Sequence, residues 1–229
     1  MSTQYEIRER FTIVQARVGA AAYKAGRDAA SIRLVLASKT QPSEAIRAAA
    51  NAGARDFGEN YVQEAIAKRA ELSDLTDIRW HLIGHLQTNK VKVAASAFAL
   101  IHSVDSVRLA ESLARAQPSP HVHALIEVNL GGEASKTGIA PDGVAAILDA
   151  ARDKLEIDGL MTIPPPAGSA EAARRYFAQL RELRDRLATQ SGYALSELSM
   201  GMTDDFEVAI EEGATIVRIG RAVFGERPK

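Results

Sequence analysis

The stretch RLVLASKTQP, residues 33–42, carries the pattern that decides the fold of this chain. A continuous run of apolar residues, 34–37, is followed almost at once by polar residues and by Lys39. An apolar run without polar alternation is typical of a strand that is covered on both faces, as in parallel sheets. The polar residues behind it predict a loop at the carboxyl end of that strand.

The same pattern recurs about eight times, with short apolar runs alternating with segments of helical periodicity. The predicted strands cover residues 33–37, 54–58, 78–84, 99–103, 122–129, 155–163, 194–200 and 215–220. The predicted helices between them include residues 43–52, 61–72, 106–116, 141–151 and 170–189. Eight strand–helix units are the number found in a (β/α)8 barrel. An open doubly wound sheet also alternates in this way, but the first strand lacks a following Gly-x-Gly-x-x-Gly turn, so the barrel is favoured.

One more helix is predicted ahead of the first strand. Ile7, Phe11, Val14 and Val18 are spaced as on one face of a helix, and the pattern fades at Gly26. We expect residues 1–27 to form an extra helix that packs on the barrel. Because no Pro/Ser/Gly linker divides the chain, residues 1–229 are expected to form a single barrel domain.

Composition narrows the classes of function. Of the 229 residues, 46% are hydrophobic and 25% are charged, with a net charge of −1, so there is no basic block for binding nucleic acid. The absence of cysteine excludes disulfides, thiolate metal sites and cysteine nucleophiles. The charged first residues do not form a signal peptide, and no apolar run reaches the roughly 20 residues that span a bilayer. A cytoplasmic protein without membrane or nucleic-acid contacts is therefore expected. Because no exposed apolar stripe is evident and no second domain is expected to complete a site across subunits, a monomer is expected as well.

Lys39 is the first candidate for chemistry. Side chains alternate along a strand, so Lys39 lies on the same side as Val35 and faces the barrel interior if Val35 does. A desolvated lysine can be neutral and nucleophilic, as a Schiff base with a carbonyl requires. The alternative is a lysine that ends a strand at the solvent, since an apolar run followed by lysine is common.

The loop in residues 198–205, LSMGMTDD, is a candidate phosphate site. Gly201 comes between a strand and a predicted helix start, where N–H groups attract anions. Barrel enzymes often hold a phosphate between the loops after strands seven and eight, and the eighth loop supplies Gly220. Asp204 and Asp205 would repel a phosphate, so we expect them to point outward or to cap the helix. The alternative is a glycine turn followed by a cap.

Arg218 lies within an apolar strand, on the same face as Ile216 and Gly220. A guanidinium in such surroundings needs an acceptor, because an unpaired buried charge is very costly. Inside a barrel it could donate to a ligand's ring nitrogen or to a carboxylate. The alternatives are an internal salt bridge with a strand-end acid such as Glu59, or exposure at an edge.

No metal site is expected. His81 and His85 are four residues apart on a predicted strand, about 13 Å, too far for one ion to bind both. His81 shares the parity of Ile83 and can line the barrel. Lys136 lies in a glycine loop that lacks the spacing of a phosphate-binding P-loop, so a solvated lysine is favoured there.

A lysine Schiff base together with an arginine or acid at the pyridine nitrogen is what pyridoxal phosphate sites impose. With these residues the chain resembles the pyridoxal phosphate homeostasis protein family, stand-alone relatives of the alanine racemase N-terminal barrel. The resemblance implies an α/β fold, a TIM-like barrel of that type. The matching stretches occur in order over nearly the whole chain after the first helix: ASKTQP, FGENYVQE, WHLIGHLQTNK, HSVDS, VNLGGEASKTGI, GLMTI, LSMGMTDDFEVAIEEG and RIGRAVFG.

The resemblance implies pyridoxal 5'-phosphate as cofactor and a set of binding residues. Lys39 would form the covalent aldimine, Arg218 would face the pyridine nitrogen, and Asn60 and His81 would lie near the ring. The residues that would surround the phosphate come from the last two loops: Ser199, Gly201, Met202, Gly220 and Arg221. Departures from the family pattern are small, and one of them is Arg221, at a position where the family varies.

The resemblance also implies a role in vitamin B6 and amino-acid homeostasis, as a carrier or buffer with little or no turnover and no catalytic residue. Arg218 cannot accept a proton, so the ring nitrogen should stay unprotonated and carbanion chemistry weak. A racemase also needs a second acid/base, which alanine racemases take from a second domain not expected here. Apo-enzymes that depend on pyridoxal phosphate are possible partners. The alternatives are an amino-acid racemase or related enzyme using Lys39, and a cofactor-free Schiff-base aldolase, disfavoured because its lysine usually lies late in the barrel.

Overall fold

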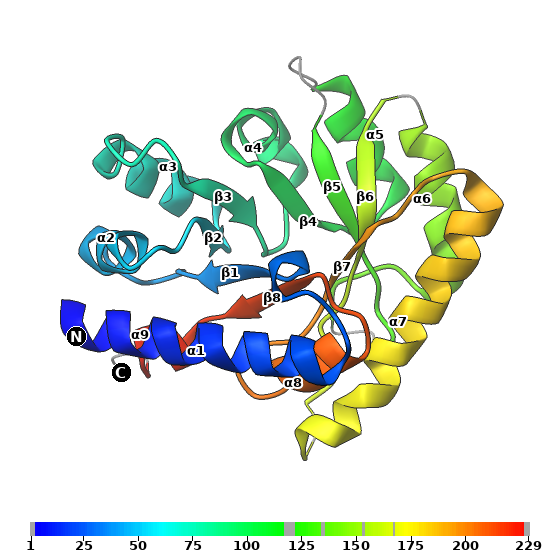
Figure 1. The fold of residues 1–229 in the computed structure, drawn as a ribbon. Helices are drawn as coiled ribbons and strands as arrows, with labels where there is room; N and C mark the ends of the chain where they lie inside the picture. Colours follow the sequence, from blue (N-terminus) through cyan, green and yellow to red (C-terminus); the bar gives the residue numbers. More distant parts are fainter. Residues whose placement is uncertain (1–2, 117–121, 134–135, 153, 167, 227–229) are drawn as a thin grey trace.

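A closed barrel of eight parallel strands forms the centre of the molecule (Figure 1). The computed structural model describes residues 3–116, 122–133, 136–152, 154–166 and 168–226. Neighbouring strands pair in chain order, and β1 pairs with β8 to close the barrel. The strands are β1 (Arg33–Ala37), β2 (Asp56–Glu59), β3 (Arg79–Leu82), β4 (Leu100–Val104), β5 (His123–Glu127), β6 (Glu156–Met161), β7 (Glu197–Ser199) and β8 (Ile216–Ile219). The predicted (β/α)8 barrel is confirmed.

The strands differ from the predicted ranges by up to three residues at their amino ends and by up to two at their carboxyl ends. β1 has the predicted bounds, whereas β3, β5 and β6 each end two residues earlier than predicted. The residues that follow these strands belong to the loops at the carboxyl end of the barrel. Apolar character alone could not locate the strand ends, because residues such as Ile83 and Ile163 stay apolar while they line a loop.

Helices cover the outside of the barrel. They are α2 (Ser43–Asn51), α3 (Val62–Glu71), α4 (Val91–Ala97), α5 (Val107–Arg115), α6 (Val144–Ala151), α7 (Ala170–Ser191), α8 (Phe206–Glu211) and α9 (Arg221–Phe224), with 3-10 turns η1 (Ala29–Ser31), η2 (Thr88–Lys90) and η3 (Pro141–Gly143). α4 was not among the predicted helices, because its seven residues are too few to show a clear helical period.

The expected extra helix, α1 (Gln4–Lys24), is present and packs on α2, α8 and α9 (Figure 1). Its first turn is closed by a capping box, in which Thr3 and Glu6 each bind the other's backbone N–H. Its apolar face, which includes Phe11 and Val14, is buried. α1 therefore covers the place where the first and last strand–helix units meet.

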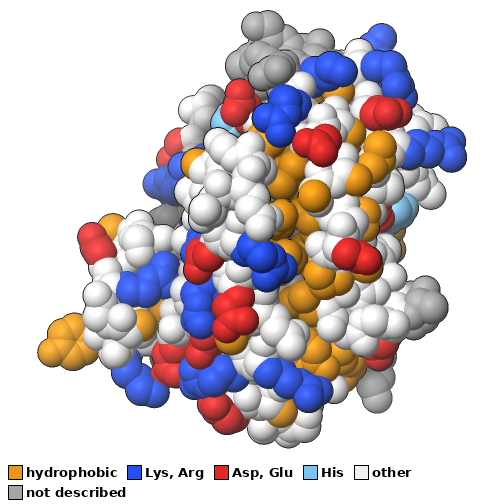
Figure 2. Space-filling model, turned by 90° about the vertical axis from the view of Figure 1, so that its right-hand side faces the viewer, with side chains coloured by type: hydrophobic (Ala, Val, Ile, Leu, Met, Phe, Trp, Pro, Cys, Tyr) orange, Lys and Arg blue, Asp and Glu red, His pale blue; other side chains and the backbone are white. Residues whose placement is uncertain are grey.

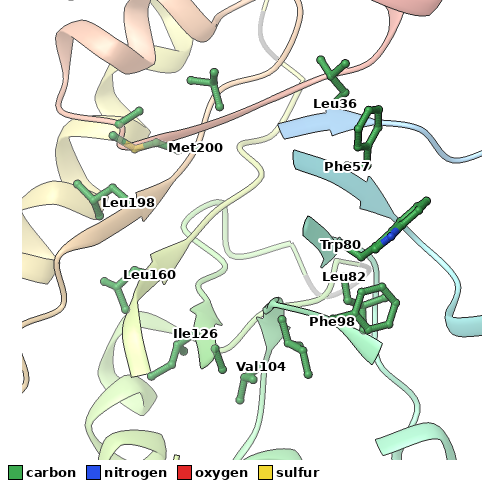
Figure 3. Packing of buried hydrophobic residues seen from close by; sticks show 14 of the residues in the cluster. Leu36, Phe57, Trp80, Leu82, Phe98, Val104, Ile126, Leu160, Leu198 and Met200 are labelled. Atoms are coloured by element: carbon green, nitrogen blue, oxygen red, sulfur yellow. The ribbon is translucent and has the colours of Figure 1, made fainter. Parts of the chain in front are cut away.

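Apolar side chains alternate between two cores. Leu36, Phe57 and Leu82 belong to the outer core between strands and helices (Figure 3). A separate cluster fills the barrel interior and consists of Val35, Leu100, Leu125, Met161 and Ile216. This confirms the predicted alternation, which places Val35 and Ile216 inside.

The surface carries both signs of charge. On the face in Figure 2, basic and acidic side chains are interspersed around a strip of hydrophobic side chains. Across the described ranges, no helix combines the length and the apolar character needed to cross a membrane.

Candidate functional site

A pocket of about 460 Å³ lies at the carboxyl ends of the strands, within the usual size range for small-ligand sites. Six of the predicted site residues line it: Lys39, Asn60, Met202, Arg218, Gly220 and Arg221. The other lining residues were not predicted as site residues: Ala37, Gln41, Ile83, Ile163, Thr203, Asp204, Gly225 and Glu226. The barrel thus brings together residues that are up to 189 positions apart in the chain, from Ala37 to Glu226.

Lys39 follows β1 and is half-buried at the wall of this pocket. The next residue, Thr40, has φ of 64°, in the left-handed region that β-branched residues rarely adopt. Such a conformation persists only when surrounding contacts impose it, and such residues cluster at functional sites.

The contacts that hold Thr40 in its left-handed conformation come from α3. The backbone N–H of Thr40 donates to Glu64 Oε1 at 2.6 Å. Lys68 Nζ pairs with the same Glu64 oxygen at 2.7 Å and donates to the carbonyl of Ser38 at 2.8 Å. The residues on both sides of Lys39 are therefore held by side chains of one helix. We call Glu64 and Lys68 of α3, together with Glu59 at the end of β2, the α3 clamp.

Glu59 completes this clamp at the end of β2. Its Oε1 accepts hydrogen bonds from Ser38 Oγ at 2.6 Å and from Lys68 Nζ at 2.8 Å. Glu59 is fully buried and its Oε2 has no hydrogen-bond partner. Burial raises the pKa of Glu59, although Lys68 and Ser38 oppose that shift. A lysine in the middle of a predicted helix gave no signal that it would be buried with this carboxylate.

Arg218 on β8 is buried and points into the barrel interior below the pocket. Its Nη1 donates to Ser199 Oγ at 2.5 Å, and its Nη2 donates to the carbonyl of Thr162 at 2.9 Å. It forms no ion pair within the described ranges, so the alternative of a salt bridge with Glu59 is wrong: Glu59 pairs with Lys68. Burial lowers the pKa of Arg218 to about 10, which leaves it protonated at neutral pH.

Two glycines shape the loops after β7 and β8. Gly201 has φ of +90°, and a Cβ there would meet Ala209 Cβ at 2.5 Å. At Gly220 a Cβ would lie 3.3 Å from the carbonyl oxygen of Ala37. Gly220 is the N-cap of α9 and gives no side-chain cap; the N–H groups of Val223 and Phe224 donate to its carbonyl, and those of Arg221 and Ala222 have no intrahelical partner and suit an anion.

The two aspartates between these glycines match the expectation only in part. Asp204 is exposed, but it lines the pocket and pairs with Arg221. Asp205 Oδ1 accepts from the N–H of Met202 at 2.7 Å in the turn before α8, and its side chain does not cap that helix. Burial raises the pKa of Asp205. Because an acid already holds the Met202 amide, the loop at Gly220 is the better seat for a phosphate.

Three predicted residues do not line the pocket: His81, Ser199 and Gly201. His81 and Ser199 lie deeper in the barrel, where the two are joined through His102. His102, and Asp56 next to His81, were missed by the sequence analysis. Their inward parity in β4 and β2 was the available signal.

Other features do not compete with this pocket. A larger cavity of about 680 Å³ near α1 is lined by four glutamates and by no lysine or arginine, so it would repel a phosphate. His85 pairs with Asp105, apart from His81, and within the described ranges no group of three metal-binding side chains occurs. Lys136 pairs with Glu133 at 2.8 Å.

The fold and the pocket define the class of the alanine racemase N-terminal barrel, whose family model (alanine racemase, N-terminal domain) matches residues 15–228. Two curated relatives, each named pyridoxal phosphate homeostasis protein, are 47% identical to this chain. The one from Pseudomonas aeruginosa aligns over 225 residues, 96% of both chains, and the one from Aquifex aeolicus over 223 residues, 96% of this chain and 97% of the relative. The solved structure of PipY from Synechococcus elongatus PCC7942, with pyridoxal phosphate bound, has a TM-score of 0.85 at 40% identity and covers 96% of this chain and 100% of PipY. The chain belongs to the pyridoxal phosphate homeostasis protein family.

Proposed function

We propose that this protein binds pyridoxal phosphate through a covalent Schiff base with Lys39 and acts as a holder of the cofactor. The observation that carries the proposal is that Lys39, Arg218 and Gly220, from opposite ends of the chain, line one pocket. The PipY structure at 40% identity supports the same ligand.

The described residues fit the cofactor. Arg218 is a buried donor that pairs with no carboxylate among the described residues, so the pyridine nitrogen would supply a further acceptor beside Ser199 and the Thr162 carbonyl. The backbone N–H groups of Arg221 and Ala222 would hold the phosphate, whereas the Arg221 side chain at the pocket wall already pairs with Asp204 and Glu226. Asn60 lines the same pocket as Lys39 and Arg218 and would contact the ring.

Bound pyridoxal phosphate supplies an aldehyde for the lysine and, once its ring nitrogen is protonated, an electron sink for carbanion chemistry. Arg218, with a pKa of about 10, is too weak an acid to protonate a pyridine. The site would therefore hold the cofactor with a neutral ring nitrogen, which favours storage and delivery over amino-acid turnover.

The test is a titration of the purified protein with pyridoxal phosphate, followed by absorbance, together with an assay for amino-acid turnover. We expect a saturable spectral change in the wild type and in Lys136→Ala, and its loss in Lys39→Ala, which keeps the phosphate seat and so retains part of the affinity. A wild-type spectrum that ignores the cofactor would overturn the proposal. Turnover of roughly 1–1000 per second with alanine or serine would favour the racemase instead.

The finer expectations extend this proposal: a cytoplasmic monomer that supplies apo-enzymes dependent on pyridoxal phosphate. Light scattering on the loaded protein tests whether it is a monomer. Reactivation of an apo-enzyme, in the presence of a scavenger of free pyridoxal phosphate, tests direct delivery. Reactivation only when the scavenger is omitted would show release through free cofactor.

A further inference from the structure

A continuous chain of hydrogen bonds runs through the barrel interior below Arg218. Asp56 Oδ1 lies 2.9 Å from His81 Nε2, and His81 Nδ1 lies 3.0 Å from His102 Nε2. His102 Nδ1 lies 2.9 Å from Ser199 Oγ, which accepts from Arg218 Nη1 at 2.5 Å. We call Asp56, His81, His102 and Ser199 the barrel relay.

Only one proton arrangement satisfies every member of the relay with both histidines neutral. The ionised carboxylate of Asp56 can only accept, so His81 donates from Nε2 and accepts at Nδ1. His102 then donates from Nε2 and accepts the hydroxyl proton of Ser199 at Nδ1. Since Arg218 can only donate, its bond to Ser199 points in the same direction as all the others. The hydrogen bonds run one way, from the pocket to Asp56.

The protonation states agree with this arrangement. Burial lowers the pKa of His81 and holds the pKa of His102 well below 6.5. For Asp56, burial works against ionisation, but hydrogen bonds from His81 and Arg79 outweigh it and lower the pKa.

The relay joins the two ends of the barrel. Asp56 and Arg79 line a second cavity, of about 400 Å³, at the amino-terminal ends of the strands, whereas Arg218 lines the cofactor pocket. Between these ends, His102 and Ser199 are fully buried beside the apolar inner cluster that includes Leu100 and Met161. Hydrogen bonds in such surroundings are strong, and a half-satisfied network there would be costly.

We infer that Asp56, His81 and His102 are positioning residues for the cofactor, which act through Ser199 to fix the direction of the Arg218 guanidinium. The inference rests on the proposed function, because it concerns the donor offered to the pyridine nitrogen. Ser199 and the Thr162 carbonyl occupy one N–H on each terminal nitrogen, and this fixes the plane of the guanidinium and leaves its remaining N–H groups for the ligand. A barrel interior filled only with Val, Leu and Ile would pack as well without holding Arg218 in this way.

The test uses pyridoxal phosphate labelled with ¹⁵N in the ring, bound to the wild type and to variants of His102. The readouts are the ¹⁵N chemical shift of the bound ring and the dissociation constant. His102→Leu removes both the donor and the acceptor in the middle of the relay, whereas His102→Gln retains one of each. His123→Gln is the matched control, since His123 is exposed and pairs with Asp158, outside the relay.

We expect His102→Leu to shift the ring resonance and to weaken binding about tenfold, the size expected for loss of one hydrogen bond to a charged group. His102→Gln should recover most of both effects, and His123→Gln should match the wild type. An unchanged shift and affinity in folded His102→Leu would overturn the inference.

Two further arms keep the outcome decisive. If His102→Leu does not fold, Asp56→Asn takes its place, because asparagine keeps the shape of the side chain but removes the charge at the end of the relay. Asp56→Asn should shift the ring resonance in the same direction as His102→Leu. An unchanged resonance in Asp56→Asn overturns the inference. A wild type that leaves no phosphopyridoxyl group on Lys39 after borohydride reduction overturns the proposed function, and this inference with it. A wild-type adduct with unaffected variants overturns the inference alone.

Discussion

The carboxylate of Glu64 accepts a hydrogen bond from the backbone N–H of Thr40 at 2.6 Å, so α3 holds the turn that follows Lys39. Thr40 is one of two non-glycine residues with positive φ among those described, and the contact with Glu64 explains why this conformation persists. The position of Lys39 is thus set by a residue 25 positions further along the chain.

Glu64→Ala should release this turn and weaken the binding of pyridoxal phosphate about tenfold, because a hydrogen bond to a charged acceptor is worth roughly 1.5–3 kcal/mol. A cofactor titration followed by absorbance measures the effect. Glu71→Ala is the control, since Glu71 lies on the same helix and accepts from Ser43 instead. Equal affinities for Glu64→Ala and Glu71→Ala would show that the clamp does not position the lysine.

Lys68→Met should destabilise the protein by about 3 kcal/mol, because it leaves the buried carboxylate of Glu59 without its cation. Urea denaturation measures the free energy of unfolding. Adding Glu59→Gln to Lys68→Met should recover at least half of the loss, since the uncompensated charge is then gone. A loss below about 1 kcal/mol in the single variant contradicts this account of the clamp.

Gly201→Ala should cost about 3 kcal/mol or more of stability, because the new Cβ would combine a left-handed backbone with a clash against Ala209. Gly192→Ala separates the two effects: Gly192 has φ of +78°, and an added Cβ would meet no other atom within 4 Å, so this change should cost only about 1 kcal/mol. Thermal unfolding of both variants gives the comparison. Equal losses would mean that the Gly201 turn is less tightly packed than described.

The free energy of unfolding should fall as the pH drops below about 6.5. The lowered pKa values of His81 and His102 keep both neutral in the folded protein, whereas the unfolded chain takes up protons there. Two such groups give a slope of up to roughly 2.7 kcal/mol per pH unit. The folded state therefore loses stability on acidification, down to the folded-state pKa values.

Urea denaturation between pH 7.5 and pH 5.5 measures this slope. In His102→Leu one group fewer takes up a proton on unfolding, so the slope of the unfolding free energy with pH should fall by up to roughly 1.4 kcal/mol per pH unit. The exposed-site control His123→Gln should keep most of the wild-type slope. Comparing variants with the wild type cancels the contribution of carboxyl groups such as Glu59. An identical slope in His102→Leu would mean that His102 is not held neutral.

Much of the fold was predictable because each strand–helix unit carries its own local signal. Side-chain alternation predicted that Lys39 would face the interior if Val35 did, and it grouped Arg218 with Ile216; the structure has Val35 and Ile216 inside and both Lys39 and Arg218 at the pocket. These are properties of single strands, so they need no knowledge of neighbours.

The supports of the site were not predictable in the same way. The clamp joins Lys68 of α3 to the ends of β1 and β2, and in the sequence Lys68 looks like any surface lysine of a helix. In the relay, Asp56 and His102 lie in different strands, and only the closed barrel shows that they are joined through His81. Such contacts depend on register between elements, which periodicity within one element does not contain.

Borohydride reduction of the protein with pyridoxal phosphate, followed by peptide mapping in a mass spectrometer, tests the central claim most directly. The account predicts one phosphopyridoxyl group per chain, on the peptide that contains Lys39, and none on that peptide in Lys39→Arg. A modification found mainly on another lysine, such as Lys136, or no modification at all, would contradict it.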